Sequence, residues 1–332
     1  MISVIVVNWN RKELLRACLQ SLRAQAGAEF EVIVVDNGSV DGSAEMAETE
    51  FACRVIRNQE NRGFCAANNQ GFAAARGGFI ALINNDAEAC EGWLAALERA
   101  CSSAADVGMA ASKVLVWEDP GRIDKAGHLI FPDGQNRGRG TGEPDRGQFD
   151  REEDVLWPDG CAAMYRKAML DEIGGFDEDF FAYGDDAELG LRARIAGWRC
   201  IYTPEAVVRH HRGSTLGKGS VRRLRLIERN RLLLATKLFP WSLLVLNPVF
   251  FAARLAAGAV AALRGAGDTA YFPGIGGKWR LAWGLAAGQF QALVLAPRML
   301  GKRAGLARIR RLTPGQVRRL IWRNRLRLKD VA

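Results

Sequence analysis

The chain has 332 residues, of which 48% are hydrophobic and 25% charged, a composition typical of an ordered globular protein and not of a disordered one. Its net charge of +9 is unevenly distributed: residues 1–208 carry a net charge of −13, whereas residues 209–332 contain 25 Lys and Arg and three acids. An acidic body with a basic tail predicts an anionic partner for the tail, either a membrane surface or nucleic acid.

The seven cysteines are scattered along the chain, and none of them forms a CxxC pair. This pattern favours reduced thiols in a cytosolic setting over a zinc site or a disulfide scaffold. The first three residues lead directly into an apolar run, so no signal peptide is expected.

Apolar runs alternate with helical segments over the first 84 residues. Strands are predicted at 3–9, 31–36, 54–57 and 79–84. A helix is expected to begin with a capping box of Asn10 and Glu13 and to end near Gln25. Another helix follows the turn-rich segment 37–43, and a third ends at Ala75. Strands that alternate with helices at this spacing predict an α/β fold built on a parallel sheet.

Polar residues stand where these apolar strands end. Asn8, Asp36 and Asp86 are all expected at the carboxyl edge of one sheet, where ligands bind in open α/β folds. Asp86 alone could be a solvated loop acid, but three such endings together predict a binding crevice. The first strand–helix turn carries no GxGxxG, and the chain contains no Walker-type loop, which disfavours dinucleotide-dependent oxidoreductases and P-loop enzymes.

The second half of this body is less regular. Residues 116–156 are rich in Gly, Pro, Asp and Arg, and they predict an irregular excursion that covers the site, for which a mobile lid is one interpretation. His128 within it is predicted to be a surface residue rather than a ligand. Strands are predicted at 158–166 and 199–202, followed by a loop at 204–214. Asp185 and Asp186 are placed at a helix N-terminus. They could simply complement the helix dipole, or form a carboxylate pair with a raised pKa beneath two Phe residues.

An ordered series of motifs runs through residues 1–240 and resembles the family 2 inverting glycosyltransferases, in particular their rhamnosyltransferase-like branch. The series comprises Val6–Asn10, Val35–Ser43, Asn61–Phe64 with Asn68-Asn69, Leu82–Asp86, Gly160–Arg166, Gly174–Glu178, Phe180–Leu191 and Pro204–Ser214. The resemblance implies a GT-A fold, which is Rossmann-like with helices on both faces of a mostly parallel sheet. It also implies a nucleotide-sugar donor and a divalent metal, Mn²⁺ or Mg²⁺.

The resemblance also implies roles for individual residues. Asp186 would be the general base, paired with Asp185 where the family more often has Glu. Asp86 and His210 would bind the metal, with His211 as the alternative to His210. Asn84 stands where the family more often has Asp. Asp36 would accept a hydrogen bond from the imide of uracil or thymine. The residues implied to bind the nucleotide sugar are Val7, Asn8, Asp36, Asn61, Gly63, Asn68, Asn84 and Asn85.

Residues 221–332 are predicted to form a basic, amphipathic helical region next to a catalytic domain at 1–220. Two apolar stretches, 241–263 and 281–300, could span a membrane. However, Arg254 at mid-membrane would cost roughly 2.5–3.5 kcal/mol, and a single span would place one flanking basic cluster on each side, against the positive-inside rule. Interfacial helices on an anionic membrane satisfy both constraints. A two-pass hairpin, soluble helices and a homo-oligomer interface stay open as alternatives, and nucleic acid is disfavoured because the arginines alternate with Leu, Ile and Trp.

Taken together, these features predict a glycosyltransferase at the cytoplasmic face of the cell membrane. It would move a sugar, with rhamnose as one candidate, from a dTDP- or UDP-sugar to a hydroxyl of a lipid-linked or polysaccharide acceptor. A non-catalytic nucleotide-sugar-binding or scaffold subunit is the alternative, and Asn84 is the residue that supports it.

Overall fold

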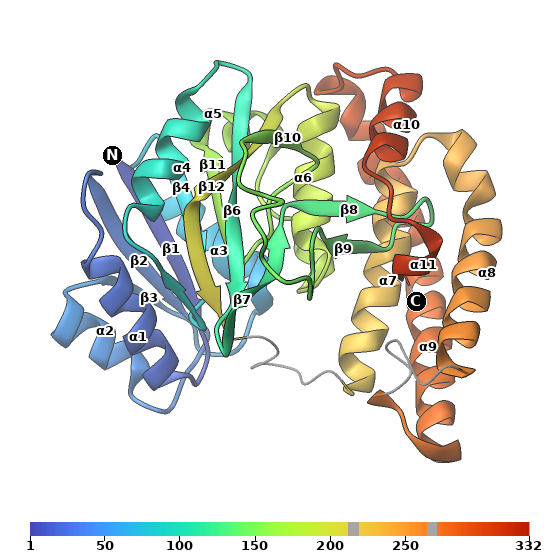
Figure 1. Ribbon diagram of the computed structural model, residues 1–332, viewed down its shortest axis with the longest axis horizontal. Coiled ribbons are helices and arrows are strands. Elements are labelled where there is room, and N and C mark those ends of the chain that lie inside the picture. Colours follow the sequence, from blue (N-terminus) through green and yellow to red (C-terminus); the bar gives the residue numbers. More distant parts are fainter. Residues whose placement is uncertain (212–218, 264–270, 332) are drawn as a thin grey trace. The chain divides into compact units, whose positions relative to one another are not determined.

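The computed structural model describes residues 1–211, 219–263 and 271–331, which fall into two compact units (Figure 1). Unit 1 contains Met1–His128 and Gly138–Arg212, and unit 2 contains Leu129–Arg137 and Gly213–Ala332. The short segment Leu129–Arg137, which lies within the predicted catalytic domain, is therefore part of the same unit as the C-terminal helices.

Unit 1 is built on one mixed sheet. Its strands, in sheet order, are β10 (Glu153–Val155), β12 (Arg199–His210), β6 (Val107–Val116), β11 (Ala162–Arg166), β4 (Phe79–Ile83), β1 (Ile2–Asn8), β2 (Phe30–Asp36) and β3 (Arg54–Arg57), with β5 (Ala87–Ala89) beside β12 and β7 (Asp119–Ala126) beside β6.

Six of these strands run in one direction. β1, β2, β3 and β4 pair in parallel, and β6 and β12 share their direction because the antiparallel strand β11 lies between β4 and β6. The predicted α/β fold with a mostly parallel sheet is therefore confirmed. The parallel register places Asn8 beside Asp36, because both residues end their strands at the same edge.

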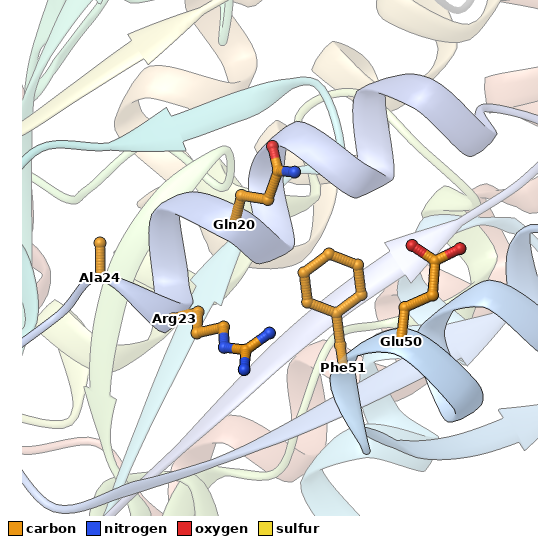
Figure 2. Close-up of a pocket in the computed structure, with 5 residues that line it drawn as sticks. All are labelled: Gln20, Arg23, Ala24, Glu50 and Phe51. Carbon is orange, nitrogen blue, oxygen red and sulfur yellow. The ribbon is translucent and has the colours of Figure 1, made fainter.

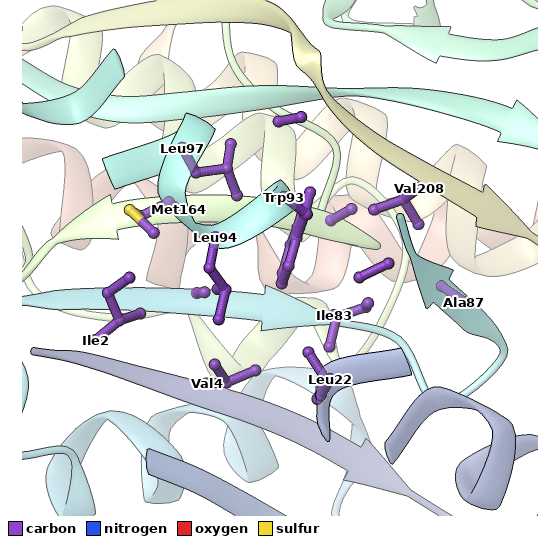
Figure 3. Close-up of a cluster of buried hydrophobic side chains, with 14 of the residues drawn as sticks. Ile2, Val4, Leu22, Ile83, Ala87, Trp93, Leu94, Leu97, Met164 and Val208 are labelled. Atoms are coloured by element: carbon purple, nitrogen blue, oxygen red, sulfur yellow. The ribbon is translucent and has the colours of Figure 1, made fainter. Parts of the chain in front are cut away.

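Helices cover this sheet. They are α1 (Lys12–Arg23), α2 (Ser43–Phe51), α3 (Gly63–Ala74), α4 (Trp93–Ser102), α5 (Lys167–Ile173) and α6 (Asp185–Ile195), with a short 3₁₀ turn, η1 (Glu178–Phe180). Figure 3 shows Trp93, Leu94 and Leu97 of α4 among the apolar side chains of the sheet. All three are fully buried, and each such side chain contributes about 1.5–3 kcal/mol to the stability of the fold.

The predicted capping box at the start of α1 is wrong. Asn10 has a positive φ of 49°, and its side chain accepts a hydrogen bond from the backbone N–H of Val40. The first turns of α1 and α2 are both held by Asp41, whose carboxylate accepts from the N–H groups of Lys12 and Ser43. A side chain from the next βα loop thus supplies the anion that the helix N-terminus requires.

The prediction of an irregular excursion at 116–156 is also wrong in large part. β7 extends the sheet from Asp119 to Ala126, and β10 adds its edge strand. Between them, β8 (His128–Ile130) and β9 (Asn136–Gly138) form a separate two-stranded sheet. The predicted loop at 204–214 is strand as far as His210, and its residues from 212 onward lie outside the described part of the chain.

Unit 2 is helical. It contains α7 (Val221–Leu238), α8 (Trp241–Leu263), α9 (Gly274–Gly305), η3 (Leu306–Arg308), α10 (Pro314–Arg323) and α11 (Leu328–Val331). α9 packs closely on α7 at two glycines. A Cβ atom at Gly288 would lie 2.8 Å from the carbonyl oxygen of Arg225, and one at Gly284 would lie 2.8 Å from the Leu224 side chain. Larger residues at these positions would separate the two helices.

A buried ionic cluster lies within unit 2. Arg254 Nε is 2.7 Å from Asp133 Oδ2, and its Nη2 is 2.8 Å from Glu228 Oε1. Arg231 donates to the backbone oxygen of Asp133 at 2.6 Å, and Asn247 Nδ2 donates to the same oxygen at 2.8 Å. Arg254 is therefore paired with two buried acids, which offsets part of the cost expected for this residue at mid-membrane.

Among the described residues, one helix is long and apolar enough to cross a membrane by length and composition. It is the Trp241–Ala261 part of α8, of which 11% is buried. Core helices of soluble proteins satisfy the same criteria, so length and composition alone do not assign this helix to a membrane.

Candidate active site

The carboxyl ends of β1 and β2 hold a cluster of amide and carboxylate groups. Asn8 Nδ2 donates to Asp36 Oδ1 at 3.2 Å and to Ser43 Oγ at 2.8 Å, and Asn85 Nδ2 donates to Asn8 Oδ1 at 2.8 Å. Asp36 is 3% exposed, and its second oxygen accepts from the Ser39 N–H at 2.9 Å. Three residues predicted from separate strands thus lie together. An ionised carboxylate has about four acceptor positions, so Asp36 keeps capacity for a ligand donor.

The loop before α3 is held by amide side chains. Asn37 Nδ2 donates to Asn61 Oδ1 at 3.4 Å and to the Gly63 carbonyl at 3.2 Å, and Asn61 Oδ1 also accepts from the Gly63 N–H. Gly63 has a φ of +84°, and a Cβ atom there would lie 2.5 Å from the Phe181 ring. The Phe181 carbonyl accepts from the Phe64 N–H at 2.9 Å, so this contact joins the loop to the segment before α6.

Two of the predicted donor-binding residues have local structural partners instead. Asn68 is buried, and its side chain donates to the Phe64 carbonyl one turn earlier in α3. Val7 is half-buried on β1, opposite Val35. These contacts do not bring either side chain to Asp36, so the assignment of Asn68 and Val7 to the nucleotide sugar remains a prediction.

The turn Asn84–Asp86 lies between β4, β11 and β12. The Asn84 N–H donates to Cys161 O at 2.9 Å, and the Asp86 carbonyl accepts from the His211 N–H at 2.9 Å. These bonds place the Asp86 side chain beside the end of β12, where His210 Nε2 lies 3.4 Å from Asp86 Oδ1. The family resemblance implied both residues of this pair.

A third residue, Asp124 on β7, completes this group and was not predicted. Its Oδ2 lies 2.9 Å from His210 Nδ1, which leaves Nε2 directed toward Asp86. Burial alone would lower the pKa of His210, but the hydrogen bonds with Asp124 and Asp86 outweigh this effect and raise it to about 9. At this pKa the ring is protonated at neutral pH, so a divalent cation would bind His210 Nε2 and Asp86 in place of that proton. The imidazole nitrogen and the carboxylate oxygen, 3.4 Å apart, suit such a cation, and Asp124 on the other ring nitrogen would orient the histidine ligand.

Asp185 and Asp186 begin α6, as predicted from the sequence, and Gly184 precedes them. Burial and the neighbouring charge of Asp186 raise the pKa of Asp185 to about 8. The pKa of Asp186 is also raised, first by burial and further by Asp159, against the opposing effects of His128 and Lys125. Asp186 Oδ2 accepts from the Gly160 N–H at 3.3 Å, and Oδ1 accepts from the Ala187 N–H at 2.7 Å. A buried carboxylate with a raised pKa can serve as a general base near neutral pH.

The prediction that His128 is a surface residue is wrong. Its residue exposure is 5%, and its Nε2 lies 2.7 Å from Asp159 Oδ2 and 3.6 Å from Asp186 Oδ2. Lys125 Nζ lies 2.6 Å from the same Asp159 oxygen. One feature of the sequence could have indicated this buried ionisable group: Asp124, Lys125 and His128 are three ionisable residues within five positions. The glycine content of the surrounding segment argued against it.

A short path of contacts connects the Asp86 turn to Asp186. Cys161, which accepts from Asn84, donates its own N–H to Asp159 Oδ1 at 2.9 Å. The neighbouring residues Asp124 and Lys125 contact His210 and Asp159, respectively. β7 therefore contributes to both groups.

A shallow open pocket on unit 1 holds none of the predicted site residues. It is lined by Gln20, Arg23, Ala24, Glu50 and Phe51 (Figure 2). These residues belong to the C-terminal ends of α1 and α2. Because both helices begin at the carboxyl edge of the sheet, this pocket lies toward the opposite edge.

Comparison with known proteins identifies the family. The model of glycosyl transferase family 2 matches residues 3–174, and that of glycosyl transferase family group 2 matches residues 145–291. The chain belongs to glycosyl transferase family 2. The first match covers β1 to α5, with Asp36 and Asp86, and the second covers Asp186 and His210.

The relatives differ in length from this chain. The chain is 28% identical over 238 residues to the uncharacterized protein y4gI of Sinorhizobium fredii, which covers 65% of the chain and 25% of that protein. It is 25% identical over 240 residues to the N-acetylglucosaminyl-diphospho-decaprenol L-rhamnosyltransferase of Mycobacterium tuberculosis, covering 66% of the chain and 78% of that protein. The chain thus spans a quarter of one relative and most of the other.

Among solved structures, GalNAc-T7 with UDP, GalNAc and Mn²⁺ aligns with a TM-score of 0.60 at 16% identity, covering 76% of this chain and 50% of that one. At this identity the likeness concerns the fold. It confirms the predicted GT-A architecture, and the rhamnosyltransferase relative agrees with the predicted branch of the family.

Proposed function

We propose that the chain is an inverting glycosyltransferase that moves a sugar from a dTDP- or UDP-sugar to a hydroxyl of a lipid-linked or polysaccharide acceptor. The observation that carries the proposal is the pairing of Asp86 with His210 at the edge of the sheet. From the Asp86 turn, contacts continue through Cys161 to Asp159, and from Asp159 to His128, which faces the buried Asp186 carboxylate. The rhamnosyltransferase relative makes dTDP-rhamnose the first donor to test.

In this proposal Asp36 accepts a hydrogen bond from the imide N–H of the donor's pyrimidine. Its buried carboxylate, fixed by Asn8 and the Ser39 N–H, presents acceptors only. Cytosine has no imide N–H at that position, so it would leave the carboxylate unpaired and be bound less well. Asn85 supports this arrangement through Asn8, while Asn61 and Gly63 shape the adjoining loop.

Asp86 and His210 would hold a divalent cation, Mn²⁺ or Mg²⁺, with Asn84 nearby in the same turn. Such a cation stabilises the negative charge that develops on a nucleoside diphosphate leaving group. An Asn in place of an Asp removes one anionic ligand, so the proposal predicts a weaker metal site than one with two acids.

Asp186 would act as the general base. Its carboxylate takes the proton of the acceptor hydroxyl as that oxygen forms a bond to the anomeric carbon, and the bond to the diphosphate breaks with its electron pair leaving on the phosphate oxygen. Attack from the face opposite the leaving group inverts the anomeric configuration. Asp185, with its pKa raised to about 8, would remain protonated beside Asp186 at neutral pH and so add no second negative charge.

We further propose that unit 2 binds the anionic cytoplasmic face of the cell membrane, where a lipid-linked acceptor would be available. Large apolar side chains are exposed on α8 and α9, and they include Trp241, Val245, Val249, Ile275, Trp279, Trp283, Phe290, Leu293 and Val294. Exposed basic residues lie nearby on α9 and α10, including Lys278, Arg280, Arg318 and Arg319. Aromatic and aliphatic side chains beside Lys and Arg are typical of interfacial membrane binding.

The decisive experiment is turnover of Asp186→Asn. The full chain would be incubated with Mn²⁺ and a panel of dTDP- and UDP-sugars, and transfer and donor hydrolysis would be measured. Loss of at least about 100-fold in kcat, with donor binding kept, is the expected result for removal of a general base. The matched control is Asp171→Asn, an exposed acid on α5 that pairs with Lys167. Near-wild-type turnover of Asp186→Asn would refute the base assignment, and donor binding without turnover in the wild type would favour a non-catalytic subunit.

A further inference from the structure

Beside Asp186 lies a buried group of three ionisable side chains: His128, Asp159 and Lys125. Asp159 Oδ2 is 2.7 Å from His128 Nε2 and 2.6 Å from Lys125 Nζ, and Asp159 is 7% exposed. His128 Nε2 also faces Asp186 Oδ2 at 3.6 Å. One ring nitrogen of His128, Nε2, thus faces both carboxylates. Trp157 stacks on the imidazole with the ring centroids 6.0 Å apart and an interplanar angle of 26°.

A metal ion is one alternative for this group. The ligand atoms of His128, Asp159 and Asp186 all lie within 4.8 Å of one another. However, the Lys125 ammonium already occupies a hydrogen-bonding position on Asp159 and would repel a cation bound there. Burial opposes the ionisation of Asp159, but Lys125 and His128 outweigh it and hold the pKa of its carboxyl well below the usual range. These charges therefore favour a role for this group in controlling protonation over a role in binding a metal ion.

The charges around Asp186 come from four elements. α6 supplies Asp185, the segment before β11 supplies Asp159, β7 supplies Lys125 and β8 supplies His128, while the buried Tyr165 of β11 also interacts with Asp186. Lys125 and Asp159 form an ion pair and offset each other. The remaining group that faces Asp186 directly and can carry a positive charge is His128.

We infer that His128 is a positioning residue for the transfer reaction: oriented by Asp159, its imidazole faces the buried Asp186 carboxylate, keeps it ionised and fixes it for attack on the acceptor hydroxyl. The inference rests on the proposed function, because it requires Asp186 to be the base. His128 itself exchanges no proton with substrate in this scheme. Its role is to offset the cost of placing a charged carboxylate in a buried site.

The first test is the pH dependence of kcat/KM for His128→Gln in the full chain. Glutamine can still donate a hydrogen bond to Asp159 but carries no charge. Without the imidazole, whose charge lowers the pKa of Asp186, Asp186 holds its proton to higher pH. The acidic limb of the profile therefore moves upward by about one unit, and activity below that limb falls about tenfold. At higher pH the activity returns toward the wild-type plateau. A uniform loss at every pH, or an unchanged limb, would overturn the inference.

The second test does not depend on turnover or on the folding of a His128 variant. The chain has only three histidines, so their ring signals can be followed by NMR as a function of pH. Coupling between two charges is reciprocal, so neutralising Asp186 in Asp186→Asn lowers the titration midpoint of His128 relative to the wild type. An identical midpoint in the two proteins would refute the coupling.

The two tests also separate this inference from the proposed function. If Asp186→Asn keeps near-wild-type turnover, the assignment of the base fails, whatever His128 does. If Asp186→Asn is inactive but neither the pH profile of His128→Gln nor the histidine titration moves, the base stands and the role of His128 is refuted.

Discussion

His210 Nε2 lies 3.4 Å from Asp86 Oδ1, and the other ring nitrogen of His210 lies 2.9 Å from Asp124 Oδ2. The imidazole is thus held between one carboxylate that would share a cation with it and another that fixes its orientation. A carboxylate on the distal nitrogen of a metal-binding histidine also makes the ligand nitrogen more basic.

We therefore expect Asp124→Asn to weaken Mn²⁺ binding by about 10–100-fold, the range typical for loss of a residue that orients a metal ligand. Binding of Mn²⁺ to the purified chain, followed by electron paramagnetic resonance or calorimetry, measures this directly. Asp119→Asn is the matched control, because Asp119 lies on the same strand but is exposed and pairs with Arg122. Equal Mn²⁺ affinity in both variants would contradict the role of Asp124.

Asp185→Asn should change the pH dependence of stability. Burial first, and then the Asp186 charge, raise the pKa of Asp185 from 3.8 to about 8. Between those values the folded state binds more protons than the unfolded state, so this group makes the protein less stable as pH rises. One unit of pKa difference corresponds to about 1.4 kcal/mol. The side chain at this position does not titrate in the Asp185→Asn variant. The free energy of unfolding of the variant should therefore fall less between pH 5 and pH 8 than that of the wild type, by more than about 1 kcal/mol.

Urea unfolding of the wild type and Asp185→Asn at both pH values tests this prediction. The quantity to compare is the difference in the free energy of unfolding between pH 5 and pH 8. The same difference in both proteins would mean that Asp185 is not held protonated in the folded state.

Arg254→Met should destabilise unit 2. The substitution removes one positive partner from the buried carboxylates of Asp133 and Glu228. Removal of one partner from a buried ion pair typically costs about 3–5 kcal/mol. Chemical denaturation followed by circular dichroism measures the loss. Arg280→Met, at an exposed position of α9, is the control and should change stability by less than about 0.5 kcal/mol. Similar effects of the two substitutions would argue against a structural role for the cluster.

Replacing Trp279 and Trp283 by Ser should weaken membrane binding. The two side chains are 72% and 70% exposed and lie one turn apart on the same face of α9. Flotation with vesicles that contain anionic lipid should show a lower bound fraction for the double variant and a salt-sensitive bound fraction for the wild type. Trp117→Ser, an exposed position of unit 1, serves as control. No binding of the wild type would remove the membrane proposal altogether.

Much of the site could be predicted from the sequence because its members end strands. Apolar runs that stop at Asn8, Asp36 and Asp86 identify parallel strands, and parallel strands end at a common edge. The helix that begins at Asp185 could also be predicted from a local pattern, because the apolar residues that follow it recur at nearly helical spacing. The family motifs added His210, whose contact with Asp86 the structure then showed.

The groups that the sequence did not reveal depend on contacts between distant segments. His128 looked like a loop residue because its neighbours are glycine-rich, and only the return of the chain at Asp159 and Asp186 buries it. Asp133 and Arg254 likewise acquire their partners only when unit 2 folds.

The sequence by itself thus determined the order of strands and helices in residues 1–84, the sheet edge that carries the polar residues, and the apolar and basic character of the C-terminal helices. Only the tertiary structure decided which charges meet. Hydrophobic periodicity is a local property of the chain, whereas the burial and pairing of an ionisable side chain depend on residues that become its neighbours only after folding.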